Sequence, residues 1–218
     1  MDNGFYSSAD DCCAKAKALG YKWLAVEWNQ FNNAQRAPAL RAACTHHGLF
    51  YTIWFTRSGH PDNNMDLTPA EALKACVESS CDGFLAEGEI PAESAPDTPN
   101  PQEQNWPALI AALAPIDIPK GVVTNFAPFT RHNGFPYPEK AKPLIDAGWH
   151  CLTECYDMSG DPTQWIERRN FWATTHLGWP RAQPVLGVYG GRTLADFPTR
   201  DNYENWSVWD AGTAPAVN

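Results

Sequence analysis

The stretch Leu67–Glu89, LTPAEALKACVESSCDGFLAEGE, holds a helix pattern followed directly by a strand pattern, and it decides the fold class. Thr68, Pro69 and Glu71 supply an N-cap, a first-turn proline and a capping-box partner, so the pattern predicts a helix through Ala75. The apolar run that follows, GFLAEGE, is typical of a buried strand. A helix joined so closely to a buried strand is the repeating unit of folds with a parallel sheet.

Short strand-like runs of this kind alternate with helical patterns along the chain. Eight are predicted: NGFYS from Asn3, KWLAVEW from Lys22, LFYTIWF from Leu49, GFLAEGE from Gly83, GVVTNF from Gly121, WHCLTECY from Trp149, PVLGVYG from Pro184 and NWSVWD from Asn205. Eight strands with intervening helices in 218 residues predict an α/β fold, a small (β/α)8 TIM barrel. An open doubly wound parallel sheet is the alternative.

Two further helices have recognisable boundaries. Ser8 and Gly20 supply the start and the stop of the first helix, and Asp161 with Pro162 marks the start of TQWIERRNFWATTHLG. Pro143 lies within PEKAKPLIDAG, where an interior proline removes a hydrogen bond and clashes with the preceding turn. That helix is therefore predicted to begin late.

The chain has no Ser/Gly-rich or charged linker, so residues 1–218 are predicted to form a single domain. The sequence stops soon after the eighth predicted strand, where a barrel normally adds a covering helix. We interpret AGTAPAVN, at the end of the sequence, as leading out of a domain excised from a longer chain.

The charge balance limits the class of partner. A net charge of −9 and a pI near 5.0 argue against nucleic acid or an anionic membrane surface, and favour a neutral or cationic substrate. No apolar run is long enough to insert into a membrane, and the first residues do not resemble a signal peptide. These observations leave the location open, with a phage virion, the cell exterior and the cytosol all compatible.

Cysteine and histidine patterns indicate no metal centre. The seven cysteines include no CxxC pair and are interpreted as small buried hydrophobes. The six histidines include no HExxH motif. His46 and His47 close a predicted helix, where a cation interacts favourably with the helix dipole. Neither a metal nor a cofactor is predicted.

Barrel enzymes build their active sites at the carboxyl ends of the strands, which selects a few candidates among the 25 acidic residues. Carboxylates at these positions can act as acid and base, while aromatic rings stack on sugars. The convergence of both kinds of side chain predicts a sugar site. Its candidate residues are Glu27, Trp54, Glu87, Glu89, Asn125, Glu154, Tyr156, Asp157, Tyr189 and Trp209.

Glu87 and Glu89 are the central pair of this set. Residues two apart on a strand share a face, so both are predicted to point into the barrel mouth. Two neighbouring carboxylates push one pKa upward, which suits a general acid beside an ionised partner. The alternative is a polar strand end that simply meets solvent.

The segment DGFLAEGE, Asp82 to Glu89, resembles the fourth-strand signature Asp-Gly-x-Asp-x-Asp-x-Glu of family-18 glycoside hydrolases, the chitinases and their relatives. Asp82, Gly83 and Glu89 match, whereas Leu85 and Glu87 replace the two inner aspartates. The resemblance implies that Glu89 protonates the glycosidic oxygen and that Glu87 helps to steer the N-acetyl group of the substrate, whose carbonyl serves as nucleophile.

Two further segments carry the resemblance. In ECYDMSG, Tyr156 and Asp157 resemble the family's sixth-strand Tyr-Asp pair, which implies hydrogen bonds to the acetamido group. Trp209 in NWSVWDAG is similar to the eighth-strand tryptophan that floors the sugar pocket. Family-25 lysozymes resemble the chain as well, with an acidic-x-Glu strand end in a barrel of about this length. Both families cleave bonds next to N-acetyl sugars.

Two hypotheses about function follow. The first is a glycoside hydrolase acting on an N-acetylated polysaccharide, peptidoglycan or chitin-like, by carboxylate acid catalysis. The second is a catalytically degenerate barrel that binds carbohydrate or serves a structural role in a phage tail or cell-surface assembly. The departures at Leu85 and Glu87 favour the second. In both hypotheses the partner is a glycan, alongside other domains of a larger chain or assembly.

Overall fold

A computed structural model of the chain describes residues 8–28, 33–57, 67–88, 106–126, 129–130, 135–156, 160–187, 192–203 and 205–209. Within them one seven-stranded sheet has the order β1-β2-β3-β4-β5-β6-β7, and every neighbouring pair is parallel. The strands are β1 Trp23–Glu27, β2 Phe50–Arg57, β3 Gly83–Gly88, β4 Lys120–Thr124, β5 His150–Cys155, β6 Ala182–Gly187 and β7 Ser207–Trp209. They correspond to the second to eighth predicted runs. The first, from Asn3, lies outside the described residues.

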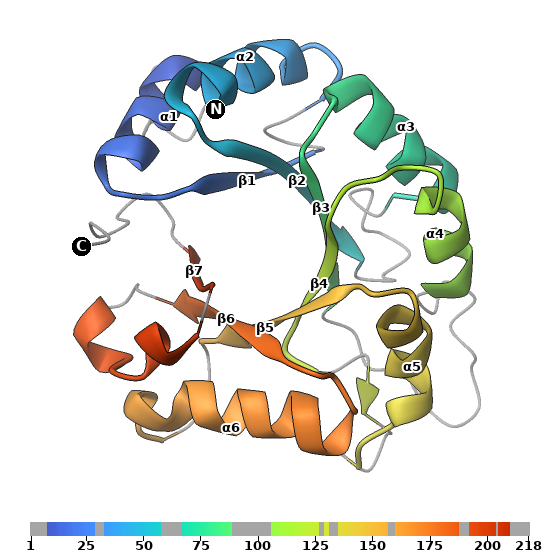
Figure 1. The fold of residues 1–218 in the computed structure, drawn as a ribbon, viewed down its shortest axis with the longest axis vertical. Helices are drawn as coiled ribbons and strands as arrows, with labels where there is room; N and C mark the ends of the chain where they lie inside the picture. Colours follow the sequence, from blue (N-terminus) through green and yellow to red (C-terminus); the bar gives the residue numbers. More distant parts are fainter. Residues whose placement is uncertain are drawn as a thin grey trace.

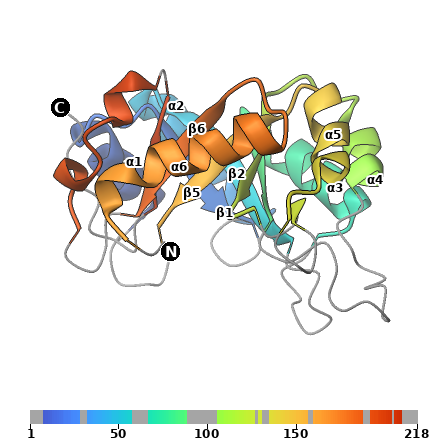
Figure 2. The ribbon, with the colours of Figure 1, turned by 90° about the horizontal axis from the view of Figure 1, so that it is seen from below.

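The helices lie outside a curled arc of strands (Figure 1), and a side view shows them around the edge of the molecule (Figure 2). Because all strands are parallel and follow in chain order, the doubly wound alternative, whose strand order reverses, is excluded. The predicted α/β barrel architecture is confirmed for the seven strands that the structure describes. The helices are α1 Ala9–Ala18, α2 Ala37–His47, α3 Pro69–Ser79, α4 Trp106–Leu113, α5 Pro138–Asp146 and α6 Trp165–Phe171, with short turns at Pro162–Gln164, Trp172–His176, Leu194–Asp196 and Arg200–Asn202.

Each strand presents alternate residues to the helices outside and to the interior of the barrel. Outward-facing side chains, among them Tyr51, Ile53 and Phe84, join a large apolar cluster with the helices. Inward-facing residues form a separate, smaller cluster inside the barrel. The inner cluster consists of Leu85, Leu152 and Val185, with Trp23, Ala25, Trp54, Val123 and Tyr156 packed against it.

The helix boundaries follow local chemistry with one exception. The capping box at Thr68 is present: the Glu71 amide donates to the Thr68 hydroxyl at 3.3 Å, and the Thr68 amide donates to the Glu71 carboxylate at 2.8 Å. The predicted late start of the helix containing Pro143 is wrong, because α5 begins at Pro138 and keeps Pro143 inside. Burial of Ala141 and Leu144 holds this helix in place despite the missing hydrogen bond.

Gly121 on β4 faces the crowded interior of the barrel. A Cβ atom there would lie 2.7 Å from Leu152 Cδ1, 3.0 Å from Leu85 Cδ2 and 3.2 Å from the His150 carbonyl oxygen. We therefore expect Gly121→Ala to lower the free energy of unfolding by about 1–3 kcal/mol, the usual range for overpacking. Urea titration measures this directly. An unchanged midpoint would mean that the interior is looser than these distances imply.

Candidate active site

Three buried glutamates lie at the carboxyl ends of alternate strands: Glu27 on β1, Glu87 on β3 and Glu154 on β5. Their exposed fractions are 6%, 6% and 2%. Glu87 and Glu154 each lie two residues beyond a member of the inner cluster, Leu85 and Leu152 respectively, so they face inward as well. Glu27 faces inward because its register partner on β2, Trp54, packs against the same cluster.

The strand register places Glu27 and Glu87 at the same height. The partner of Glu27 is Trp54, and the partner of Trp54 on β3 is Leu85, two residues before Glu87. A TIM barrel with eight strands and a shear of eight advances by about one residue per strand at constant height. Two strands along from Glu27, the residue at the same height is therefore Glu87.

The same count continues round the barrel to Glu154. Glu87 pairs with Val123, and Val123 pairs with Leu152, two residues before Glu154. Layers built by alternate strands are the normal filling of such barrels. We define Glu27, Glu87 and Glu154 as the carboxylate layer.

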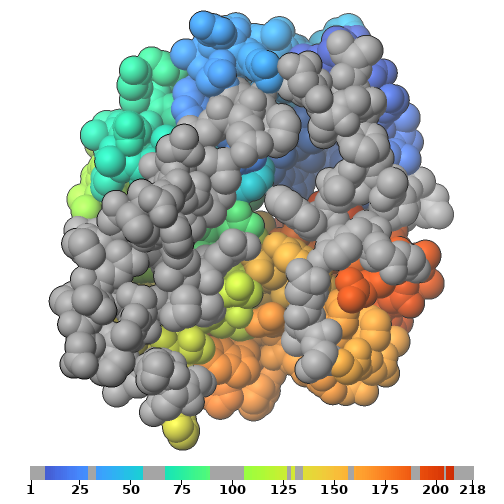
Figure 3. Space-filling view, turned by 180° about the vertical axis from the view of Figure 1, so that it is seen from behind, coloured from blue at the N-terminus to red at the C-terminus, as the bar shows by residue number. Residues whose placement is uncertain are grey.

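Glu154 pairs with Val185 on β6, and Val185 pairs with Ser207 on β7. Trp209, two residues beyond Ser207, is therefore the fourth position at the height of this layer. Trp209 lies in β7, but its side chain is outside the described part of the structure. Trp54 and Tyr156 are half-buried against the inner cluster. Figure 3 views the side opposite to Figure 1, and atoms of the green-to-orange part of the chain, which contains β3 to β5, reach the surface near its middle. Among the described residues, the predicted carboxylates Glu27, Glu87 and Glu154 and the rings of Trp54 and Tyr156 therefore lie at one end of the barrel.

Glu27 is held in surroundings that favour its neutral form. Burial raises the pKa of the Glu27 carboxyl above its ordinary value. Among the described residues, Glu27 Oε1 has no hydrogen-bond partner. A buried carboxyl that keeps its proton toward neutral pH is chemically suited to donate it.

Replacing Glu27 by Gln should stabilise the protein at pH 7 relative to the parent. Because the folded-state pKa lies above the ordinary value of 4.5, Glu27 is protonated in both states at lower pH and carries no penalty there. As pH rises through the raised pKa, the unfolded chain has lost this proton, whereas the folded protein must keep it or bury a charge. The free energy of unfolding therefore falls. Gln removes this penalty, so the variant's advantage should be present at pH 7 and absent near pH 4 in urea titrations. A parent that is more stable than the variant at pH 7 would show that the Glu27 charge is compensated.

Arg169 on α6 is a residue near the site that sequence reasoning missed. Its Nη1 donates to the Asn125 carbonyl oxygen at 2.7 Å, its guanidinium lies over the Phe126 ring, and its charge interacts with Glu154 and Tyr156. Burial lowers the pKa of Arg169. Within the run WIERRNFW nothing distinguishes Arg169 from a solvent-facing helix residue.

Asp82 and Gly83, which open the segment that resembles the family-18 signature, both make contacts that stabilise the fold. The Asp82 carboxylate accepts a hydrogen bond from the Tyr51 amide at 3.0 Å and pairs with the Arg41 guanidinium. A Cβ on Gly83 would lie 2.9 Å from Thr52 Oγ1. The Asp-Gly pair therefore serves the junction of α2, β2 and β3.

Several predicted residues lie outside the described part of the chain. Glu89, Asp157 and Tyr189 belong to this group. The roles predicted for them remain predictions. For Asn125, the structure assigns the backbone carbonyl to Arg169, and the side chain is half-buried.

The seven cysteines are free and buried. Cys13 on α1 lies 3.5 Å from Cys44 on α2, sulfur to sulfur. Their burial agrees with the interpretation of these residues as small hydrophobes.

No protein-family model matches this sequence, and no curated protein matches it either. Solved structures do. The chain is 14% identical to 3-keto-D-glucoside 4-epimerase from E. coli, with a TM-score of 0.57 over 96% of this chain and 89% of that one. An AP endonuclease, family 2, from Brucella melitensis gives 13% identity and a TM-score of 0.53 over 95% and 89%. For endo-beta-N-acetylglucosaminidase from Cordyceps militaris the identity is 10% and the TM-score 0.52, over 84% of this chain and 69% of that one.

At these identities the likeness shows the fold alone: the chain has the α/β architecture of TIM-barrel enzymes. Among the helices in the described ranges, none is long and apolar enough to cross a membrane.

Proposed function

We propose that this protein is a glycoside hydrolase acting on an N-acetylated polysaccharide, peptidoglycan or chitin-like, by carboxylate acid catalysis. The observation that carries the proposal is the carboxylate layer: Glu27, Glu87 and Glu154 are buried at the carboxyl ends of alternate strands. Burying a carboxyl group is costly whether it stays ionised or must keep its proton, so stability alone does not account for three of them. Buried titratable groups at this end of a barrel are characteristic of active sites.

In the proposed reaction, Glu89 donates a proton to the glycosidic oxygen as the bond from that oxygen to the anomeric carbon breaks. The carbonyl oxygen of the substrate's own N-acetyl group forms the new bond to that carbon. Glu87 orients and stabilises the acetamido group. Water then opens the intermediate and returns a proton to Glu89.

The other predicted residues bind and position the substrate in this proposal. Tyr156 and Asp157 donate and accept hydrogen bonds to the acetamido group, while Trp54 and Trp209 stack on sugar rings. Glu27, Asn125, Glu154 and Tyr189 contribute polar contacts around them. The raised pKa of Glu27 suits a group that donates a hydrogen bond to the sugar.

The similar structures are compatible with this chemistry. One of them is named as an endo-beta-N-acetylglucosaminidase and another as an epimerase of a 3-keto-D-glucoside. Both show that this fold accommodates enzymes that act on carbohydrates, which supports the proposal.

A second candidate function is a carbohydrate-binding or structural barrel without activity, carried by a phage tail or cell-surface assembly. Leu85 favours it. This residue, which replaces an aspartate of the family signature, is packed with Leu152 and Val185 in the inner cluster. The interior at this position is therefore apolar and would not suit the aspartate that the family signature has there.

Hydrolysis of defined substrates separates the two functions. The parent and Glu89→Gln would be incubated with purified bacterial cell wall and with chitin oligomers, and new reducing ends counted. Release by the parent and not by the variant supports the enzyme. If neither protein releases sugar and both are retarded on a glycan affinity gel, the binding function is correct and the hydrolase proposal is wrong.

A further inference from the structure

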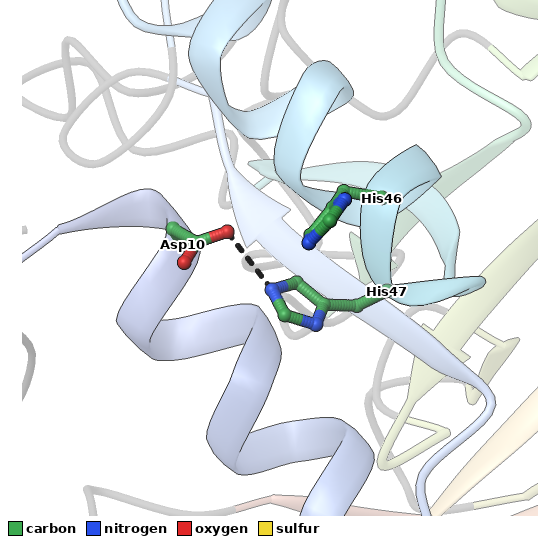
Figure 4. A group of neighbouring side chains, drawn as sticks. All are labelled: Asp10, His46 and His47. Carbon is green, nitrogen blue, oxygen red and sulfur yellow. Dashed lines mark hydrogen bonds and ion pairs between the residues drawn. The ribbon is translucent and has the colours of Figure 1, made fainter.

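The geometry points to a binding site for a divalent transition-metal ion of the Zn²⁺ type between α1 and α2, with Asp10, His46 and His47 as its protein ligands. In the described part of the chain, these side chains bring one possible ligand atom each within 4.8 Å of one another. They lie together outside the sheet (Figure 4). The site is separate from the carboxylate layer and is independent of the proposed hydrolase activity.

Two of the three ligands are already in contact. His47 Nε2 lies 2.9 Å from Asp10 Oδ1, and the ring centroids of His46 and His47 are 4.7 Å apart in a T-shaped arrangement. Ligand atoms around a tetrahedral zinc ion, with bonds of about 2.0–2.1 Å, are separated by about 3.3 Å. The Asp10–His47 pair must therefore open by a few tenths of an ångström, and the His46 ring must move inward.

The local backbone permits such a movement. His46 and His47 are the last two residues of α2, which ends at Gly48 with a left-handed φ of 65°. Asp10 and His46 are exposed, so both side chains can change rotamer without disturbing a core. His47 is the best-anchored ligand, with 18% of its side chain exposed against 69% for Asp10.

The donor set and the charges suit a transition-metal cation. Two imidazole nitrogens and one carboxylate oxygen are typical ligands of zinc, and water completes a tetrahedron. The carboxyl end of a helix carries partial negative charge, which favours a cation at the end of α2. An ion bound to His47 Nε2 requires the neutral imidazole, which then carries its proton on Nδ1.

Bound at this position, the ion would join α1 to α2. The two helices also contact each other through the buried pair Cys13 and Cys44. A ligand that binds only the folded state raises its stability. Zinc is therefore expected to increase the thermal unfolding midpoint of the protein.

Calorimetric titration of the protein with Zn²⁺ in a non-chelating buffer tests the site. We expect one ion per chain, with His46→Ala and Asp10→Asn each weakening binding by at least about tenfold. The control His176→Ala removes an exposed imidazole elsewhere and should bind as the parent does. All three substitutions are at exposed positions, and equal unfolding midpoints without metal would confirm that the variants fold.

Two outcomes would overturn the inference. One is a parent that does not bind Zn²⁺ at millimolar concentration. The other is binding that persists in His46→Ala and Asp10→Asn but disappears in Cys44→Ser, since the metal would then be held by thiolates.

Discussion

Replacing Glu87 by Gln should reduce the rate of cell-wall or chitin-oligomer hydrolysis by about 10²–10³, the usual cost of removing one group that stabilises charge in the transition state. Glu87 is 6% exposed and lies in the carboxylate layer on β3. Gln has the same size, but it cannot ionise or stabilise the positive charge that develops on the acetamido group. The loss should fall on kcat, while retention on a glycan affinity gel changes little.

The matched control for this experiment is Glu139→Gln. Glu139 is an exposed carboxylate in the first turn of α5, so the same chemical change there leaves the barrel mouth untouched. Its activity should equal that of the parent. Equal activity of Glu87→Gln and Glu139→Gln would remove Glu87 from the catalytic group.

Phe84→Ala should lower the free energy of unfolding by about 3–5 kcal/mol, the range for removal of a buried aromatic ring. Phe84 lies on the outer face of β3 with an exposed fraction of 0%. Its ring centroid is 5.0 Å from that of Phe55 and 6.0 Å from that of Trp149. Alanine leaves a cavity between the sheet and its helices, and the rings of Phe55 and Trp149 lose their contacts with Phe84.

Phe171→Ala makes the same chemical change at a surface position, where 55% of the residue is exposed. Its effect should stay within about 0.5 kcal/mol. Chemical denaturation of both variants measures the difference. A Phe84→Ala protein as stable as Phe171→Ala would mean that the outer core is not the main source of stability.

Seven strands and the helix starts at Ser8 and Thr68 could be predicted from sequence because their signals are local. The Thr68 capping box and the apolar run from Gly83 each depend on neighbouring residues, and both are present in the structure. Pro143 shows the limit of such reasoning. Its intrinsic preference is against a helix interior, but tertiary burial of Ala141 and Leu144 outweighs that preference.

The candidate site could be predicted only in part. Strand alternation identifies Glu87 as inward-facing, but its equal height with Glu27 and Glu154 depends on the register of five strands. Register is a tertiary property, because each shift changes which side chains share a layer. The same holds for Arg169 and for the contact of Asp10 with His47, which joins residues 37 positions apart. No local pattern encodes these contacts.

Binding of a glycan over the carboxylate layer is the central claim, and the indole N–H spectrum of the protein tests it most directly. An N-acetylglucosamine oligomer would be added to Glu87→Gln, in which hydrolysis is slowed, with the Trp54 signal assigned through Trp54→Phe. Trp54 packs at the inner cluster beside the layer, whereas Trp149 precedes β5 at the opposite end of the barrel. The proposal predicts that the Trp54 signal shifts on addition and the Trp149 signal does not. A spectrum in which Trp54 is unmoved while the oligomer binds would contradict it.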